Sequence, residues 1–139
     1  AKADRIDWFA DGGLVIIDYK TGAIPSDRQV RSGRYPQLPI EALIAETGGF
    51  NGIKVEKVKR LAYLQLTGGQ PAGKVRFIKE PIDITIASTK KGLIDLINRF
   101  DNVTTAYSSF PSRDSKISWN NYAHLERFQE WFSKEIGDV

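Results

Sequence analysis

The alternation of hydrophobic and polar residues near the N-terminus predicts two β-strands joined by a tight turn. The predicted strands are residues 2–9 and 13–20, and the second contains the β-branched run 15–17 (Val-Ile-Ile). The segment 11–13 (Asp-Gly-Gly) lies between them, and glycine readily adopts the left-handed backbone conformations that short hairpin turns require. We therefore predict a β-hairpin at the start of the chain.

The residues after this hairpin predict a loop and then a helix. Thr21–Arg34 is mostly polar and contains glycine and proline, which is typical of a loop. A helix is predicted to begin between Pro36 and Pro39, because proline is tolerated in a first helical turn. The same helix is predicted to end at residues 48–49 (Gly-Gly).

Two later stretches are rich in residues that favour strands. Residues 57–66 have apolar side chains at both odd and even positions, which predicts an inner strand with both faces covered. Residues 73–86 predict one or two further strands, interrupted by Pro81.

The C-terminal part of the chain has a helical period. Residues 87–107 predict one helix, residues 108–118 a polar loop, and a last helix begins near Asn120 or Asn121, either of which can cap it. The order of hairpin, helix, strands, helix and helix predicts a mixed α/β (α+β) fold with a central mixed sheet flanked by helices. The length of 139 residues predicts a single domain over residues 1–139.

Composition restricts the chemistry that this domain can perform. The chain has no cysteine, which excludes disulfides, thiolate zinc sites and cysteine-held iron–sulfur clusters. Its one histidine is His124, so a metal site would use mainly oxygen ligands, which suit Mg²⁺, Mn²⁺ or Ca²⁺. The net charge of +3 is compatible with a polyanionic partner but does not identify one.

The chain shows no segment typical of export or of a membrane protein. Residues 1–4 have no apolar core of the kind found in signal peptides, and the longest aliphatic run, Leu14–Ile17, is far too short to cross a bilayer. We therefore expect a cytoplasmic protein.

The segment Asp18-Tyr19-Lys20 at the end of the second predicted strand is the main candidate for chemistry. Because strand side chains alternate, Asp18 and Lys20 point to one face and Tyr19 to the other. The carboxylate can bind Mg²⁺, and the lysine can polarise a water or stabilise charge on a phosphate. Taken alone, this pattern is more often only the polar end of a buried strand.

The first predicted strand offers two acids, Asp4 and Asp7, on opposite faces. A three-residue loop centred on Gly12 pairs Asp4 with Lys20, and Asp4 then shares the face of Asp18. A two-residue loop at residues 11–12 places Asp7 on that face instead. The turn residues are compatible with both loops.

Three segments resemble the RecB-type nuclease family of the PD-(D/E)XK nucleases, and most closely its AddB branch. They are residues 1–7 (AKADRID), 16–22 (IIDYKTG) and 37–39 (QLP). They correspond to the family's Gly-x-x-Asp-Arg-x-Asp strand, its Asp-Tyr-Lys strand and a following helix opened by Gln. Residues 122–127, followed by Trp131, also resemble the end of AddB proteins.

The resemblance implies a restriction-endonuclease-like fold and an Mg²⁺- or Mn²⁺-dependent deoxyribonuclease of the exonuclease type. It implies a role in DNA break repair and recombination, with DNA and an AddA-like helicase–nuclease subunit as partners. The catalytic residues that it implies are Asp4, Asp18, Lys20 and Gln37, with Asp4 and Asp18 holding the metal. It therefore favours the three-residue loop and makes Asp7 a helper or structural residue.

The chain departs from the family pattern at three places. Ala1 stands where the family has Gly, and Glu41 stands where a Tyr often follows the motif Gln by four residues. If the helix already includes Gln37, that spacing puts Gln37 and Glu41 on one helix face. The family's upstream helix, which brings another metal ligand, would precede residue 1, so we expect a fragment of a larger protein. The alternative function is a nuclease-fold module for DNA binding or subunit contact, inactive in this form.

Overall fold

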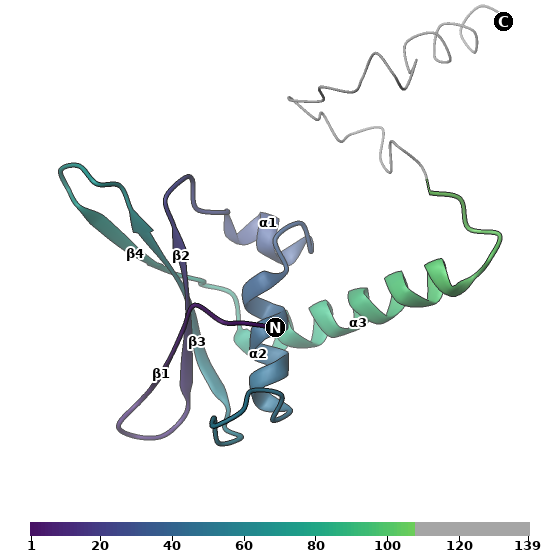
Figure 1. Ribbon diagram of the computed structural model, residues 1–139, viewed down its shortest axis with the longest axis horizontal. Helices are drawn as coiled ribbons and strands as arrows, with labels where there is room; N and C mark the ends of the chain where they lie inside the picture. The colour runs from purple at the N-terminus through teal and green to yellow at the C-terminus, as the bar shows by residue number, and fades with distance from the viewer. Residues whose placement is uncertain (108–139) are drawn as a thin grey trace, which may run out of the picture. The chain divides into compact units, whose positions relative to one another are not determined.

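The computed structural model describes residues 1–107, and their elements are arranged around a four-stranded sheet of order β1-β2-β3-β4 (Figure 1). The elements are β1 (Arg5–Trp8), β2 (Leu14–Lys20), α1 (Asp27–Arg31), α2 (Gln37–Glu46), β3 (Val58–Leu66), β4 (Gly73–Phe77) and α3 (Ile82–Asp101). All of them lie in the compact unit Ala1–Asp101.

The β1–β2 hairpin turns through the loop Ala10–Gly12. Phe9 N–H donates to the carbonyl of Gly13, and Gly12 N–H donates to the carbonyl of Phe9, both at 3.0 Å. Gly12 and Gly13 have φ angles of 82° and 88°, in the left-handed region that glycine adopts without steric cost. The loop therefore has three residues. Its centre is Asp11, whereas the three-residue loop considered from the sequence was centred on Gly12.

This change shifts the hairpin register without changing the faces. Ile6 lies opposite Ile16, whereas a loop centred on Gly12, which pairs Asp4 with Lys20, would place Ile6 opposite Asp18. The same register, continued one pair beyond Arg5 and Ile17, brings Asp4 opposite Asp18. Because the shift is two residues along one strand, each side chain keeps the face that the three-residue loop predicts.

The sheet is mixed. Strands β2 and β3 are parallel and are connected through α1 and α2, whereas β1–β2 and β3–β4 are antiparallel pairs. Strand β3 is an inner strand, as its two apolar faces predict. The mixed α/β fold with a central mixed sheet and helices is thus confirmed, and it is consistent with a restriction-endonuclease-like arrangement.

Helices α2 and α3 lie on the same side of the sheet (Figure 1), and α2 contacts both β2 and β3. The core forms between this sheet face and the helices, because the even-numbered positions of β2 point toward α2. Its buried members are Leu14, Ile16, Val30, Leu38, Ala42, Ala45, Val58, Leu61, Tyr63, Ile78 and Ile86.

The segment predicted to be a loop, Thr21–Arg34, contains the short helix α1. Ser26 caps its N-terminus, accepting from the Gln29 backbone N–H, while the Gln29 side chain accepts from the Ser26 N–H. This reciprocal capping box satisfies backbone donors that a five-residue helix would otherwise expose. The helix has no apolar stripe, and the hydrophobic pattern therefore missed it.

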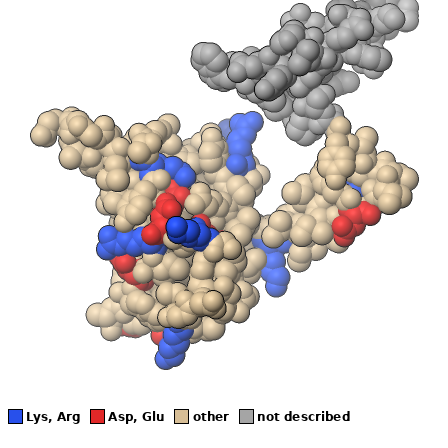
Figure 2. Space-filling view, in the orientation of Figure 1, with Lys and Arg blue, Asp and Glu red and all other residues tan. Residues whose placement is uncertain are grey.

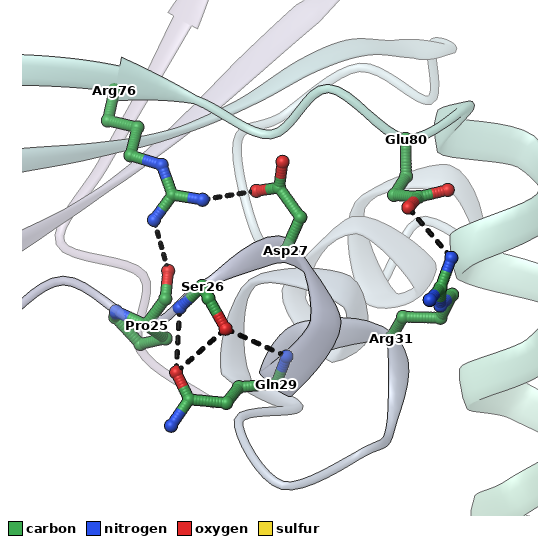
Figure 3. A network of polar contacts seen from close by, with 7 residues as sticks. All are labelled: Pro25, Ser26, Asp27, Gln29, Arg31, Arg76 and Glu80. Carbon is green, nitrogen blue, oxygen red and sulfur yellow. Dashed lines mark hydrogen bonds and ion pairs between the residues drawn. The ribbon is translucent and has the colours of Figure 1, made fainter.

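A network of polar contacts fastens α1 to the rest of the unit (Figure 3). Arg76 on β4 donates to the Pro25 carbonyl and to Asp27 Oδ1, the latter at 2.6 Å. Arg31 at the end of α1 pairs with Glu80 at 3.0 Å. We call these residues the α1 network: Pro25, Ser26, Asp27, Gln29, Arg31, Arg76 and Glu80.

The predicted strands over residues 73–86 are partly wrong, because α3 begins at Ile82. Pro81 precedes the first turn, and Thr85 N–H donates to its carbonyl at 3.0 Å. The alternation of Ile82, Ile84 and Ile86 imitates a strand. In the helix, however, Ile84 is 66% exposed while Ile86 is 6% exposed and joins the core.

Several predictions fall on residues outside the described part of the chain. They are the polar loop 108–118, the last helix near Asn120 or Asn121, and His124. A single domain over residues 1–139 also stays a prediction. Among the described helices, none combines the length and the apolar character needed to cross a membrane.

Candidate active site

The C-terminal end of β2 places two charged side chains on the sheet face that α2 covers. Asp18 follows Ile16 on this face and is 1% exposed. Lys20, two residues further, reaches back with its ammonium 2.7 Å from Asp18 Oδ2. The Lys20 side chain is 30% exposed, so this pair joins a buried carboxylate to a cation that solvent can reach.

The environment of Asp18 leaves one of its oxygens incompletely satisfied. The short contact to Lys20 lacks the alignment of a hydrogen bond, and within the described residues Asp18 Oδ2 has no hydrogen-bond partner. Its neighbour in β3 is the buried Tyr63. Burial, and then the negative charge of Asp18, raises the pKa of Tyr63 to about 12, so this hydroxyl remains protonated.

The two acids of the first strand have different surroundings. Asp4, in the bend before β1, accepts a hydrogen bond from the backbone N–H of Tyr19 at 3.0 Å, which holds it beside β2. Asp7 instead forms a double contact with Arg5, at 2.8 Å and 2.7 Å. Asp7 shares a strand face with Arg5, opposite the face through which Ile6 packs against the core. The structure therefore brings Asp4, and not Asp7, to the side of Asp18.

Helix α2 brings an amide and a carboxylate to the same place. Lys20 Nζ donates to Gln37 Oε1 at 3.4 Å, and Gln37 Nε2 donates to Glu41 Oε1 at 3.2 Å. Gln37 and Glu41 are four residues apart and so lie on one helix face. The neighbouring Leu38 and Ala42 are fully buried and anchor this part of α2 to the sheet.

Glu41 is a buried carboxylate that sequence analysis did not assign to the site. It is 3% exposed, and within the described residues its Oε2 atom has no hydrogen-bond partner. Burial raises the pKa of Glu41, and the negative charges of Asp18 and Asp4 raise it further. The sequence signals were an acid among the apolar residues of a helix and its spacing of four residues from Gln37. Hereafter the β2–α2 cluster means Asp4, Asp18, Lys20, Gln37 and Glu41.

The donors of the β2–α2 cluster fit a hard divalent cation by their chemistry. Carboxylate oxygens are the ligands that Mg²⁺ and Mn²⁺ prefer, and a buried carboxylate oxygen without a partner is costly unless a cation satisfies it. Glu41 Oε2 is such an atom, and Asp18 Oδ2 lacks a hydrogen-bond partner and has only the ion-pair contact with Lys20 at 2.7 Å. Nevertheless, residues 1–107 contain no ready-made group of three or more acidic or histidine side chains that could hold a metal ion.

The basic residues Lys57, Lys59 and Arg60, before and within β3, have partners inside the chain. Lys57 pairs with Asp83, and Lys59 lies 3.0 Å from Asp11. The Arg60 guanidinium lies 5.2 Å from the centre of the Phe77 ring. Acidic and basic side chains adjoin elsewhere too, in one patch over the sheet-and-helix unit on the face seen in Figure 2. The positive charges in 57–60 are thus surface charges with local partners.

Comparison with known proteins gives a family match over nearly the whole chain. Residues 1–135 match the family model of the PD-(D/E)XK nuclease superfamily. An uncharacterized protein of Rickettsia bellii is 30% identical over 138 residues, which cover 88% of this chain and 16% of that protein. An uncharacterized protein of Rickettsia conorii is 29% identical over 147 residues, which cover 90% of this chain and 17% of that protein. The chain therefore spans about a sixth of the length of these curated relatives. No solved structure matches it significantly.

Proposed function

Because the chain belongs to the PD-(D/E)XK nuclease superfamily, we propose that it hydrolyses phosphodiester bonds in DNA with the help of Mg²⁺ or Mn²⁺. The observation that supports this most is the buried Asp18 at the end of an inner strand, with its Oδ2 atom 2.7 Å from the Lys20 ammonium. A buried acid beside an accessible lysine suits a site where charge develops on a phosphate.

In this proposal each residue has a separate task. Asp18 and Asp4 would hold the divalent cation, which would supply Lewis-acid chemistry at the phosphate and at a bound water. Lys20 donates through Nζ to the attacking water or to the phosphate oxygens. Gln37, 3.4 Å from that ammonium, fixes its direction. Tyr19 holds the Asp4 carboxylate through its backbone N–H at 3.0 Å.

The more specific parts of the proposal depend on the resemblance to the AddB branch. They are exonuclease action, a role in DNA break repair and recombination, and an AddA-like helicase–nuclease partner. The support for them is the sequence of residues 1–7, 16–22 and 37–39.

The test is Mg²⁺-dependent degradation of linear DNA by the full-length protein and its variants. Asp18→Asn keeps the shape of the side chain but removes its charge, and we expect cleavage to fall at least about 100-fold. Asp7→Asn, on the other strand face, is the matched control and should cleave like the wild type. Cleavage by Asp18→Asn at the wild-type rate, with an unchanged melting temperature, would remove Asp18 from the mechanism.

A second candidate function is a nuclease-fold module that binds DNA or another subunit without cleaving. It is favoured by the finding that residues 1–107 hold no ready-made group of three metal-binding side chains. Mg²⁺-dependent degradation of linear DNA by the 139-residue chain alone would exclude it.

A further inference from the structure

Glu41 is the least explained charged residue of the described chain. It is 3% exposed, and of its two carboxylate oxygens only Oε1 has a hydrogen-bond partner within the described residues. Burying a carboxylate lowers stability unless it is paired and fully hydrogen-bonded. A purely structural Glu41 would be expected to have both oxygens satisfied, as the carboxylates at strand and helix ends usually are.

The contacts of Glu41 lead directly to Asp18. Gln37 bridges the two elements, because its Nε2 donates to Glu41 Oε1 at 3.2 Å and its Oε1 accepts from Lys20 Nζ at 3.4 Å. The same Nζ lies 2.7 Å from Asp18 Oδ2. Glu41 Oε2 shares a carbon with Oε1, so it lies at the same end of this chain of contacts. Asp18 and Glu41, each with one buried oxygen that lacks a hydrogen-bond partner among the described residues, thus lie on either side of one Lys20–Gln37 pair.

The charges of the β2–α2 cluster also do not balance. With Asp4, Asp18 and Glu41 all ionised, the three carboxylates carry three negative charges against the one positive charge of Lys20. The pKa of Glu41 is raised by burial and then by the negative charges of Asp18 and Asp4, so both other acids act electrostatically on Glu41. A divalent cation would neutralise this excess.

We propose that Glu41 is a third carboxylate ligand of the divalent cation, supplied by α2 to the pair formed by Asp4 and Asp18. The cation would be a hard one, Mg²⁺ or Mn²⁺, as the all-oxygen donor set requires. The inference rests on the proposed function. Among residues 1–107 the three acids do not form a ready-made metal site, and the Lys20 ammonium occupies the Asp18 Oδ2 side of the cluster at 2.7 Å. Binding therefore requires the Lys20 ammonium to leave Asp18 Oδ2 and turn toward the substrate.

The experiment is a titration of the full chain with Mn²⁺, followed by the electron paramagnetic resonance signal of the free ion. We expect Glu41→Gln to weaken Mn²⁺ binding at least about 10-fold, a loss typical of residues that support a metal site. Glu80→Gln makes the same chemical change at an exposed ion pair and should bind Mn²⁺ like the wild type. Glu41→Gln binding Mn²⁺ with wild-type affinity would overturn the proposal.

Two further variants separate the possible failures. Asp18→Asn should also lose Mn²⁺ binding. If it does while Glu41→Gln does not, the inference on Glu41 fails and the proposed function survives. If the wild type itself binds no Mn²⁺, or if Asp18→Asn binds like the wild type, the proposed function fails as well. Should Glu41→Gln not fold, Glu41→Asp keeps the charge on a shorter side chain and should weaken binding. Wild-type affinity in Glu41→Asp would overturn the proposal.

Discussion

The α1 network and the β2–α2 cluster are both built from charged side chains, but they differ in how completely these are satisfied. In the α1 network, Arg76 binds both the Pro25 carbonyl and Asp27, and Arg31 pairs with Glu80 (Figure 3). In the β2–α2 cluster, two buried carboxylate oxygens have no hydrogen-bond partner among the described residues. The first arrangement is what a structural fastening needs. The second leaves carboxylate oxygens that could coordinate a bound cation.

This difference matters because an unsatisfied buried polar group lowers stability. Asp18 at the end of β2 and Glu41 on α2 each have one buried oxygen of this kind, so the β2–α2 cluster is expected to lower stability. Local arrangements that lower stability are often found at catalytic and binding sites. We therefore expect changes in the β2–α2 cluster to lower DNA cleavage, and changes in the α1 network to lower stability alone.

The largest effect is expected for Lys20→Met. It removes the donor that would act on the substrate, so DNA cleavage should fall at least about 100-fold. It also leaves the buried Asp18 without its cationic partner, and the free energy of unfolding should decrease by about 2 kcal/mol. Urea denaturation with and without Mn²⁺ checks the second part, since the cation should restore most of the lost stability. Near wild-type cleavage by this variant would place Lys20 outside the reaction.

Arg76→Met tests the α1 network. It leaves Asp27 and the Pro25 carbonyl without their donor, and the free energy of unfolding should fall by about 2 kcal/mol. Cleavage per folded molecule should stay unchanged, because Arg76 contacts none of the β2–α2 cluster by hydrogen bond. Lys74→Met, on the same strand, serves as the control for urea denaturation. A loss of cleavage in folded Arg76→Met would show that the two regions are coupled.

The pH dependence of stability distinguishes Glu41 from an ordinary surface acid. Its pKa is raised by burial, so the folded state binds its proton more tightly than the unfolded state does. The metal-free wild type should therefore lose stability as the pH rises from about 4.3, the ordinary glutamate value, through the raised pKa of Glu41. In Glu41→Gln this loss should be absent. Identical pH profiles of the two proteins in chemical denaturation would contradict the assignment.

The smallest effect is expected for Glu80→Gln. The Arg31 and Glu80 side chains are 62% and 32% exposed, and solvent screens such pairs strongly. The free energy of unfolding should change by no more than about 0.5 kcal/mol. A larger loss in thermal denaturation would mean that the α1 network is more cooperative than its separate contacts suggest.

Local patterns in the sequence predicted part of the cluster. Strand alternation alone places Asp18 and Lys20 on one face, and the choice between Asp4 and Asp7 depended on the parity of the loop. The family resemblance favoured a loop with an odd number of residues. The structure has a loop of three residues, although it is centred on Asp11. Because strand side chains alternate, a register shift of two residues leaves each side chain on the same face. The face assignment was therefore correct despite the error in register.

Other features depend on contacts between distant parts of the chain. The burial of Glu41 arises from α2 packing on β2 and β3, which no local pattern specifies. Helix α1 had a local signal, the Ser26–Gln29 capping box, but no apolar stripe to reveal it. At the start of α3, a period of two in Ile82, Ile84 and Ile86 outweighed the helical spacing of Ile82 and Ile86. Tertiary packing then decided between the two periods.

The most direct test of a cation site in the β2–α2 cluster is a crystal structure of the chain soaked in Mn²⁺, with the ion located by its anomalous scattering. We expect a peak within about 2.2 Å of carboxylate oxygens of Asp18 and Asp4, with the Lys20 ammonium displaced from Asp18 Oδ2. A peak that Glu41 also contacts would extend this to the third ligand. A structure with no anomalous peak at these residues, and with Lys20 still 2.7 Å from Asp18 Oδ2, would contradict the account.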